Sequence, residues 1–379
     1  MRNEEGDRRI VELVADQDCL SISSAWFYGD SIGFEGLLSA SRMLCNPIYE
    51  GFVWGYGRGA MARDSQPREM DNSIPGKALV EIALARQDDR LLQELRAVCE
   101  ALSSRPQILG VSVSAQRAHL KSPYGGEALD ADERELISDP GSAIYVDCLH
   151  FEPVLFTALG VALGDRMLVE EGIRQAIAFI DLLQDPSTGL FRHFYLERTG
   201  RAYVDSWSRG QGWALLGLLD CLEVIGETID CSRIRASVSD LITALISSQR
   251  PNGHWGSLTQ DSLSSDESSA AAFFVSGLLR ALRLGIVDES VLPVVRRAWS
   301  AVVDSTDPNG VLRGVSAAVY SSTRESHYRN VPLDQLVPWG QGPWLVAREE
   351  IGRYNNAHEG SEGSISVGEG LLMEGNTRD

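Results

Sequence analysis

Asp147 is the residue of this chain whose surroundings suggest chemistry most directly. It lies in the otherwise apolar run IYVDCLHFEPVLF, residues 144–156. An ionised carboxylate is costly in apolar surroundings, so burial is expected to raise the pKa of Asp147 toward the range of a general acid. A helix cap or a hydrogen-bonded core aspartate is the alternative interpretation of the same residue.

Asp71 is the candidate for a second carboxylate. It precedes NSIPG (72–76), where a helix is expected to begin. Aspartate is also a favoured helix cap. Asp71 is therefore interpreted either as a functional partner of Asp147 or as the cap of the following helix.

Arg209 is the cation best placed to recognise an anion, because it lies in WSRGQGW (207–213) at an expected helix start. Its guanidinium keeps its charge and offers two parallel donors to a carboxylate. A buried structural ion pair is the alternative. His193 is interpreted either as a site residue or as a packed one, whereas His150, one helical turn after Asp147, is expected to be packed.

Aromatic, acidic and amide side chains gather where buried helices are expected to begin. Aromatic rings stack on the C–H faces of sugars, while carboxylates and amides bind hydroxyl groups. Glu267 also fits a simple helix cap. The residues predicted to bind a substrate in such a cleft are Trp26, Asp30, His193, Trp207, Arg209, Gln211, Trp213, Glu267 and Trp339.

The spacing of apolar side chains predicts twelve helices along the chain. These helices must therefore position the candidate site residues. Some show one apolar stripe, as in DDRLLQELRAVCEALSS (88–104). Others, such as 144–163 and 210–225, are apolar nearly all round, which is typical of helices buried on every side. The expected helices lie near residues 5–17, 29–45, 48–63, 74–87, 88–104, 144–164, 166–184, 209–226, 231–249, 267–285, 288–305 and 338–354.

Six amphipathic helices alternating with six buried ones predict an all-α fold, an (α/α)6 toroid with the buried helices as its inner barrel. GQGW (210–213) and GQGPW (340–344) both begin buried helices, which indicates an internal repeat. Short β-hairpins are expected in the connectors at 109–114, 190–195 and 311–320. The predicted domains are an N-terminal extension with the first helix at 1–18, the barrel at 19–358 and a flexible acidic tail at 359–379.

Composition limits the partners of the chain. Its 379 residues are 44% hydrophobic and carry a formal net charge of −19, which disfavours nucleic acid and anionic membranes as partners. The chain contains no apolar run long enough for a membrane span and starts without a signal-peptide pattern, so a cytoplasmic protein is expected. The six cysteines have no metal-ligand spacing, and no metal or cofactor is expected. A homo-oligomer is compatible with the sequence.

Six segments, in order, resemble the unsaturated glucuronyl and rhamnogalacturonyl hydrolases of glycoside hydrolase families 88 and 105. The resemblance covers roughly residues 20–350. The segments are MDNSIPGKAL (70–79), YVDCLHFEPVLFTALG (145–160), DPSTGLFRHFY (185–195), WSRGQGWALLGLLDCLE (207–223), NGHW with DESSAAAFF (252–255 and 266–274) and WGQGPWLVAREE (339–350).

The resemblance implies an (α/α)6 barrel that removes a 4,5-unsaturated uronic acid from the non-reducing end of oligosaccharides left by polysaccharide lyases. It implies that Asp147 is the general acid/base, which protonates C4 of the double bond and activates water for C5. Asp71 matches the second functional aspartate of the family. His193, Trp207, Arg209 and Trp213 match its substrate-binding positions.

Two departures from the family pattern bear on the substrate. The usual WARGNGW is WSRGQGW here, and Gly126 is followed by Glu127 where a histidine is common. A β-glucuronidase that uses Asp71 and Asp147 on saturated glucuronides is therefore a second interpretation. A non-catalytic sugar-binding barrel and an epimerase-like isomerase are further alternatives. The isomerase is disfavoured because it needs several histidines around the sugar and the whole chain has only six.

Overall fold

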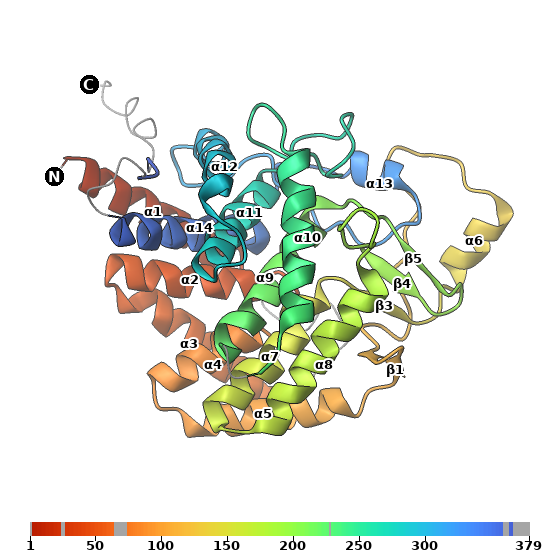
Figure 1. Ribbon diagram of the computed structural model, residues 1–379, viewed down its shortest axis with the longest axis horizontal. Helices are drawn as coiled ribbons and strands as arrows, with labels where there is room; N and C mark the ends of the chain where they lie inside the picture. Colours follow the sequence, from red (N-terminus) through yellow and green to blue (C-terminus); the bar gives the residue numbers. More distant parts are fainter. Residues whose placement is uncertain (1, 24–26, 64–73, 227–228, 359–363, 367–379) are drawn as a thin grey trace.

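The computed structural model describes residues 2–23, 27–63, 74–226, 229–358 and 364–366. Most of this chain is helical, and the strands gather with the short helices α6 (Ala131–Ser138) and α13 (Glu325–Arg329) at one end of the helical body (Figure 1). Trp26, Asp71 and nearly all of the predicted tail at 359–379 lie outside the described residues.

An inner barrel of six helices forms the centre of the molecule. Each inner helix packs against the next in chain order, and the last packs back against the first, so the ring is closed. Their side chains are buried on nearly every face, which explains the all-round apolar pattern of their sequences. The inner helices are α2 (Asp30–Leu44), α4 (Gly76–Ala85), α7 (Cys148–Leu163), α9 (Ser208–Ile225), α11 (Ser268–Arg283) and α14 (Pro338–Ala357).

Six amphipathic helices alternate with these and cover them from outside. Helix α5 (Asp89–Ser103) shows the principle, since it buries Leu91, Leu95, Val98 and Leu102 along one stripe and exposes its other face. The molecule is therefore the predicted (α/α)6 toroid. The outer helices are α1 (Arg2–Ser21), α3 (Pro47–Arg63), α5 (Asp89–Ser103), α8 (Arg166–Leu183), α10 (Ser232–Ser248) and α12 (Leu292–Asp304), the last preceded by the 3-10 turn η2 (Glu289–Val291).

The connectors carry two small antiparallel sheets. Strands β1 (Gln107–Ile108) and β2 (Val111–Ser112) form the hairpin expected near 109–114. The other sheet has the order β3-β4-β5. Its strands are β3 (Ala143–Tyr145), β4 (Phe194–Leu196) and β5 (Arg201–Tyr203).

Three local expectations are corrected by the structure. The helix expected from residue 144 begins at Cys148, because Ala143–Tyr145 pair with β4 instead. The hairpin predicted at 311–320 is wrong, since this segment contains no strand: Leu312 forms a single bridge with Thr306, and Ala317 N donates to Pro332 O of another connector at 2.9 Å. Helices α6 and α13 were not predicted, although the capping box of Asp130 and Glu133 marks the start of α6.

The repeated Gly-Gln-Gly helix starts have the same geometry. The Gln211 side chain donates to Phe191 O at 2.8 Å and accepts from Phe191 N at 2.8 Å. The Gln341 side chain donates to Gly310 O at 2.6 Å and accepts from Leu312 N at 3.1 Å. In both cases the glutamine fastens the turn that precedes its inner helix, which supports the interpretation of an internal repeat.

None of the helices in the described ranges combines the length and the apolar character that a bilayer span requires.

Candidate active site

Sheet pairing brings Asp147 next to His193. Tyr145 pairs with Phe194 in the β3–β4 ladder, and the pairing continues one residue further as Val146 N donates to His193 O at 2.9 Å. Asp147 then stands at the N-terminal end of α7, but its side chain makes no capping hydrogen bond. The Asp147 side chain therefore does not take the cap role that its position offered, and the residue is 3% exposed.

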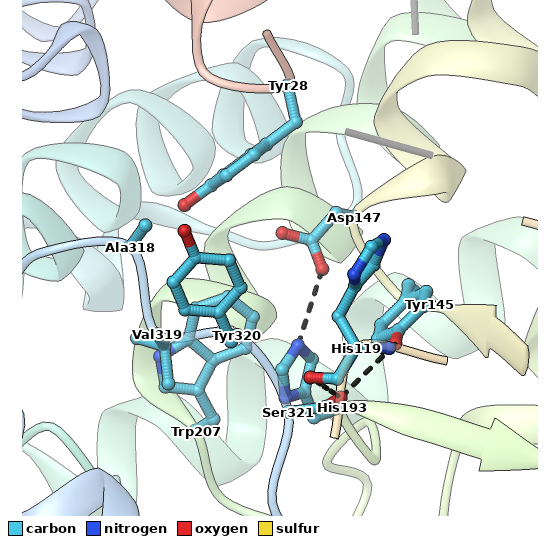
Figure 2. A pocket seen from close by; sticks show the side chains of 10 residues that line it. All are labelled: Tyr28, His119, Tyr145, Asp147, His193, Trp207, Ala318, Val319, Tyr320 and Ser321. Atoms are coloured by element: carbon cyan, nitrogen blue, oxygen red, sulfur yellow. Dashed lines mark hydrogen bonds and ion pairs between the residues drawn. The ribbon is translucent and has the colours of Figure 1, made fainter. Parts of the chain in front are cut away.

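A pocket opens onto the Asp147 carboxylate. Figure 2 shows the carboxylate directed toward the His193 ring, with Tyr28, Tyr320 and Trp207 on the other side of the space. Aromatic rings facing a carboxylate are the side chains that a sugar site requires. The lining residues are Tyr28, His119, Tyr145, Asp147, His193, Trp207, Ala318, Val319, Tyr320 and Ser321.

His193 is held rigidly as a neutral imidazole. Its Nε2 lies 3.7 Å from Asp147 Oδ2, its Nδ1 lies 2.6 Å from the Tyr328 hydroxyl, and its ring centroid lies 4.2 Å from that of Trp207. Burial lowers the pKa of His193 well below its usual value, and the nearby His327 and Arg209 lower it further. His193 therefore faces Asp147 without a positive charge of its own.

The backbone of His193 is also fixed by a strained neighbour. His193 N donates to Val204 O at 2.9 Å, and Val204 adopts φ +62°. This left-handed conformation is costly for a β-branched residue and persists only where the surrounding structure enforces it.

Arg209 lies behind the pocket wall rather than in the pocket. Its guanidinium is fully buried, with its carbon 5.0 Å from the Trp207 ring centroid and 5.4 Å from that of Trp339. Nη1 lies 3.6 Å from Glu267 Oε2, and Nη2 donates to Ala317 O at 3.2 Å. The geometry is that of the buried ion pair considered as an alternative.

Glu267 holds the same connector as Arg209, the one that contains Ser316 and Ala317. Its carboxylate accepts from Ser316 N at 3.3 Å and from the Ser269 hydroxyl at 2.5 Å. Since Ala318 and Tyr320 follow along this segment and line the pocket, Arg209 and Glu267 shape the pocket wall from behind.

The remaining predicted binding residues within the described ranges lie outside the pocket lining and support it. Trp213 is buried in the barrel core against His150, and Trp339 stacks on Tyr28 with ring centroids 5.0 Å apart. Asp30 accepts from Phe27 N at 3.0 Å, and burial raises its pKa to about 7 against this hydrogen bond. Asp147, His193 and Trp207 are thus the predicted site residues that line the pocket.

Sequence reasoning missed the pocket residues that come from two distant connectors. His119 lies on one connector, and Val319, Tyr320 and Ser321 lie on the other. The connectors are joined because Lys121 N donates to Ser321 O at 2.8 Å and the Ser321 hydroxyl donates to His119 O at 3.1 Å. No local sequence pattern marks these contacts, whereas Tyr28 and Tyr145 adjoin motifs that were singled out.

A second polar cluster fills the centre of the barrel, with one side chain from each inner helix. Lys77 Nζ lies 2.7 Å from Glu35 Oε2 and 2.6 Å from Asp220 Oδ1. His150 is packed here, as expected, with Nε2 3.3 Å from Glu35 Oε1 and 3.5 Å from Asp220 Oδ2. The six residues are Glu35, Lys77, His150, Asp220, Arg280 and Glu350.

This cluster is an ion-pair network, although Glu35, His150 and Asp220 offer three atoms within 4.8 Å of one another that could hold a metal ion. The Lys77 ammonium already bonds both carboxylates, and Arg280 Nη1 donates to Asp220 at 2.6 Å. Burial by itself lowers the pKa of Lys77, but Asp220 and Glu35 more than reverse this and hold the ammonium charged. A divalent cation would lie against two fixed positive charges.

Comparison with known proteins identifies the family. The model of Glycosyl Hydrolase Family 88 matches residues 7–355. The chain belongs to this family. The unsaturated rhamnogalacturonyl hydrolase YesR of Bacillus subtilis is 27% identical over 210 residues, which are 55% of this chain and 59% of YesR. The chain therefore spans less than two thirds of that relative's length in the alignment. Protein Atu3128 of Agrobacterium fabrum is 28% identical over 219 residues, covering 50% of this chain and 94% of that protein.

Solved structures of this family group share the fold. A structure from Salmonella enterica serovar Paratyphi A, titled a possible member of family GH105, superposes with a TM-score of 0.79 at 18% identity, covering 93% of this chain and 94% of that one. The unsaturated glucuronyl hydrolase from Bacillus sp. GL1 gives a TM-score of 0.64 at 16% identity, covering 96% and 98%. These likenesses establish the toroid for the whole family 88 region.

Proposed function

We propose that this family 88 protein is an exo-acting hydrolase that removes a 4,5-unsaturated uronic acid from the non-reducing end of an oligosaccharide. The observation that carries the proposal is the buried Asp147 carboxylate, directed into an aromatic-lined pocket beside a neutral His193. The names of the relatives YesR and unsaturated glucuronyl hydrolase support the substrate class.

Asp147 supplies the proton in the proposed reaction. Protonated Asp147 transfers its proton to C4 of the C4=C5 double bond, and the resulting carboxylate takes a proton from the water whose oxygen bonds to C5. The product is a hemiketal at C5. Its ring opens and the glycosidic bond breaks, which releases the shortened sugar and an open-chain keto uronic acid.

The other predicted residues have subordinate roles in this proposal. Trp207 and Tyr28 provide faces for the sugar ring, and His193 contacts the sugar or the water beside Asp147. Arg209, Gln211, Glu267, Trp213 and Trp339 hold these groups in place. Asp71 and Trp26 keep their predicted roles as second carboxylate and binding residue only as part of this proposal, while Asp30 holds the backbone of Phe27.

The ultraviolet absorbance of the conjugated double bond tests the proposal. Mixing the purified protein with unsaturated disaccharides made by pectin, ulvan and glycosaminoglycan lyases is expected to remove the absorbance of at least one of them. Asp147→Asn is expected to lower this rate by 10²-fold or more, about the contribution of a general acid/base, while binding is retained. Asp240→Asn, an exposed aspartate on α10, is the matched control and should keep full activity.

Three results would contradict the proposal. Release of glucuronic acid from a saturated aryl glucuronide, with no loss of absorbance, would replace it with a β-glucuronidase. Full activity of Asp147→Asn would remove Asp147 from its role, and binding of uronides without turnover would indicate a sugar-binding barrel.

A further inference from the structure

Tyr328 is the buried residue in direct contact with His193 that neither the sequence motifs nor the proposed reaction uses. It lies on the short helix α13, is 0% exposed, and packs edge-on against the His193 ring with centroids 5.6 Å apart. Its backbone carbonyl accepts from the Ser257 hydroxyl at 2.9 Å, so its position is fixed from the connector before α11 as well.

The Tyr328 hydroxyl has one hydrogen and two acceptors within reach. His193 Nδ1 lies at 2.6 Å and Ser322 O at 3.4 Å, while Ser322 N donates to the hydroxyl oxygen at 3.4 Å. A hydroxyl donor prefers 2.5–3.0 Å, so only the contact with His193 has the length of a good hydrogen bond. If Nδ1 carried the ring proton instead, the buried hydroxyl hydrogen would be left with the long contact, which is unfavourable.

The electrostatics agree with this assignment. Burial raises the pKa of Tyr328 well above its usual value, so the hydroxyl keeps its hydrogen. Burial also keeps His193 neutral, so its ring carries one proton. If Nδ1 accepts from Tyr328, that proton is on Nε2, the nitrogen that lies 3.7 Å from Asp147 Oδ2.

We infer that Tyr328 is a positioning residue, which fixes His193 in the tautomer with Nε2–H directed at Asp147. The inference deepens the proposed function and rests on it for its catalytic consequence. In this tautomer His193 stabilises the carboxylate form that Asp147 takes after it has given its proton to C4. In the opposite tautomer the bare Nε2 would face Asp147 with a lone pair and compete for the proton that the reaction needs.

The tautomer can be observed without substrate. In ¹⁵N-histidine-labelled full-length protein, protonated and bare ring nitrogens resonate in separate ranges, and the His193 signals are assigned by their loss in His193→Gln. The expected spectrum shows a protonated Nε2 and a bare Nδ1. A protonated Nδ1 would overturn the inference, even if Tyr328 variants failed to fold.

Tyr328→Phe tests the consequence, because it removes one oxygen and keeps the ring. It is expected to release His193 into a mixture of tautomers and to lower kcat by tenfold or more with little change in KM, since a misplaced histidine tautomer in catalytic triads costs up to about 10⁴. Tyr49→Phe removes a hydroxyl that bonds Asp16, far from His193, and should change neither reading. An unchanged tautomer or an unchanged kcat in Tyr328→Phe would overturn the inference.

Failure of the proposed function would appear separately, as a wild-type protein that leaves the double bond intact while the His193 tautomer remains measurable.

Discussion

At the residue scale, the direction of each side chain separates the groups that face the pocket from those that build it, because both sets are buried. Asp147 and His193 were predictable because each stands in a short motif, and the β3–β4 register then brings them together. Arg209 was predicted to meet a substrate carboxylate, because sequence spacing gives the residue type and the helix start but not the direction of the side chain. The structure directs it to Glu267 instead.

Removing Arg209 is therefore expected to cost stability before it costs affinity. Arg209→Met leaves Glu267 buried without its cation, which is expected to lower the free energy of unfolding by about 3–5 kcal/mol. Urea unfolding measures the loss. The double variant Arg209→Met/Glu267→Gln should recover much of it, because no unpaired charge remains. Wild-type stability together with a raised KM would instead show that Arg209 binds the substrate.

At the element scale, the alternation of apolar and amphipathic helices made the toroid predictable, since each pattern follows from the number of faces that a helix buries. The start of α7 was not predictable. A short apolar run such as Ala143–Tyr145 reads equally well as a buried strand or as the first turn of a buried helix, and only its pairing with β4 decides. The contacts of His119 with Ser321 were not predictable for a related reason, because they join connectors 202 residues apart in the sequence.

The repeated glutamines allow a matched comparison of two helix starts. Gln211→Ala and Gln341→Ala each leave a buried backbone N–H and C=O without a partner, so each is expected to lower the free energy of unfolding by about 1–3 kcal/mol. Their effects on activity should differ. Gln211 fastens Phe191, two residues before His193, so Gln211→Ala should also lower kcat, whereas Gln341→Ala should largely retain it. Equal losses of kcat at equal stability would contradict this division of roles.

At the scale of the whole molecule, the six inner helices are joined by charge as well as by packing. The cluster around Lys77 takes one side chain from each of them, so the register of every inner helix is tied to its neighbours. No single helix shows this in its sequence, because each contributes one polar residue that looks like an isolated exception in an apolar face. Such a network supports one arrangement of the barrel, because a shifted helix would leave a buried charge unpaired.

Buried carboxyl groups also make the stability of the barrel depend on pH. Burial raises the pKa of Glu152 on α7 to about 7, although Arg105 opposes the rise. Since the usual pKa of glutamate is about 4.3, the folded state binds this proton more tightly than the unfolded state. The stabilisation is complete below the unfolded pKa and is lost as the pH rises through about 7.

The neutral buried histidines act in the opposite direction below about pH 6.5, so the wild-type melting curve alone mixes two effects. Glu152→Gln isolates one of them, because glutamine has no proton to lose. The melting temperature of the wild type minus that of Glu152→Gln is expected to fall steadily as the pH is raised from 5, and to level off above about 7. Glu170→Gln, on the exposed face of α8, should show no such trend. A difference that is constant or rises with pH would mean that Glu152 is charged in the folded barrel, held by Arg105 rather than by its proton.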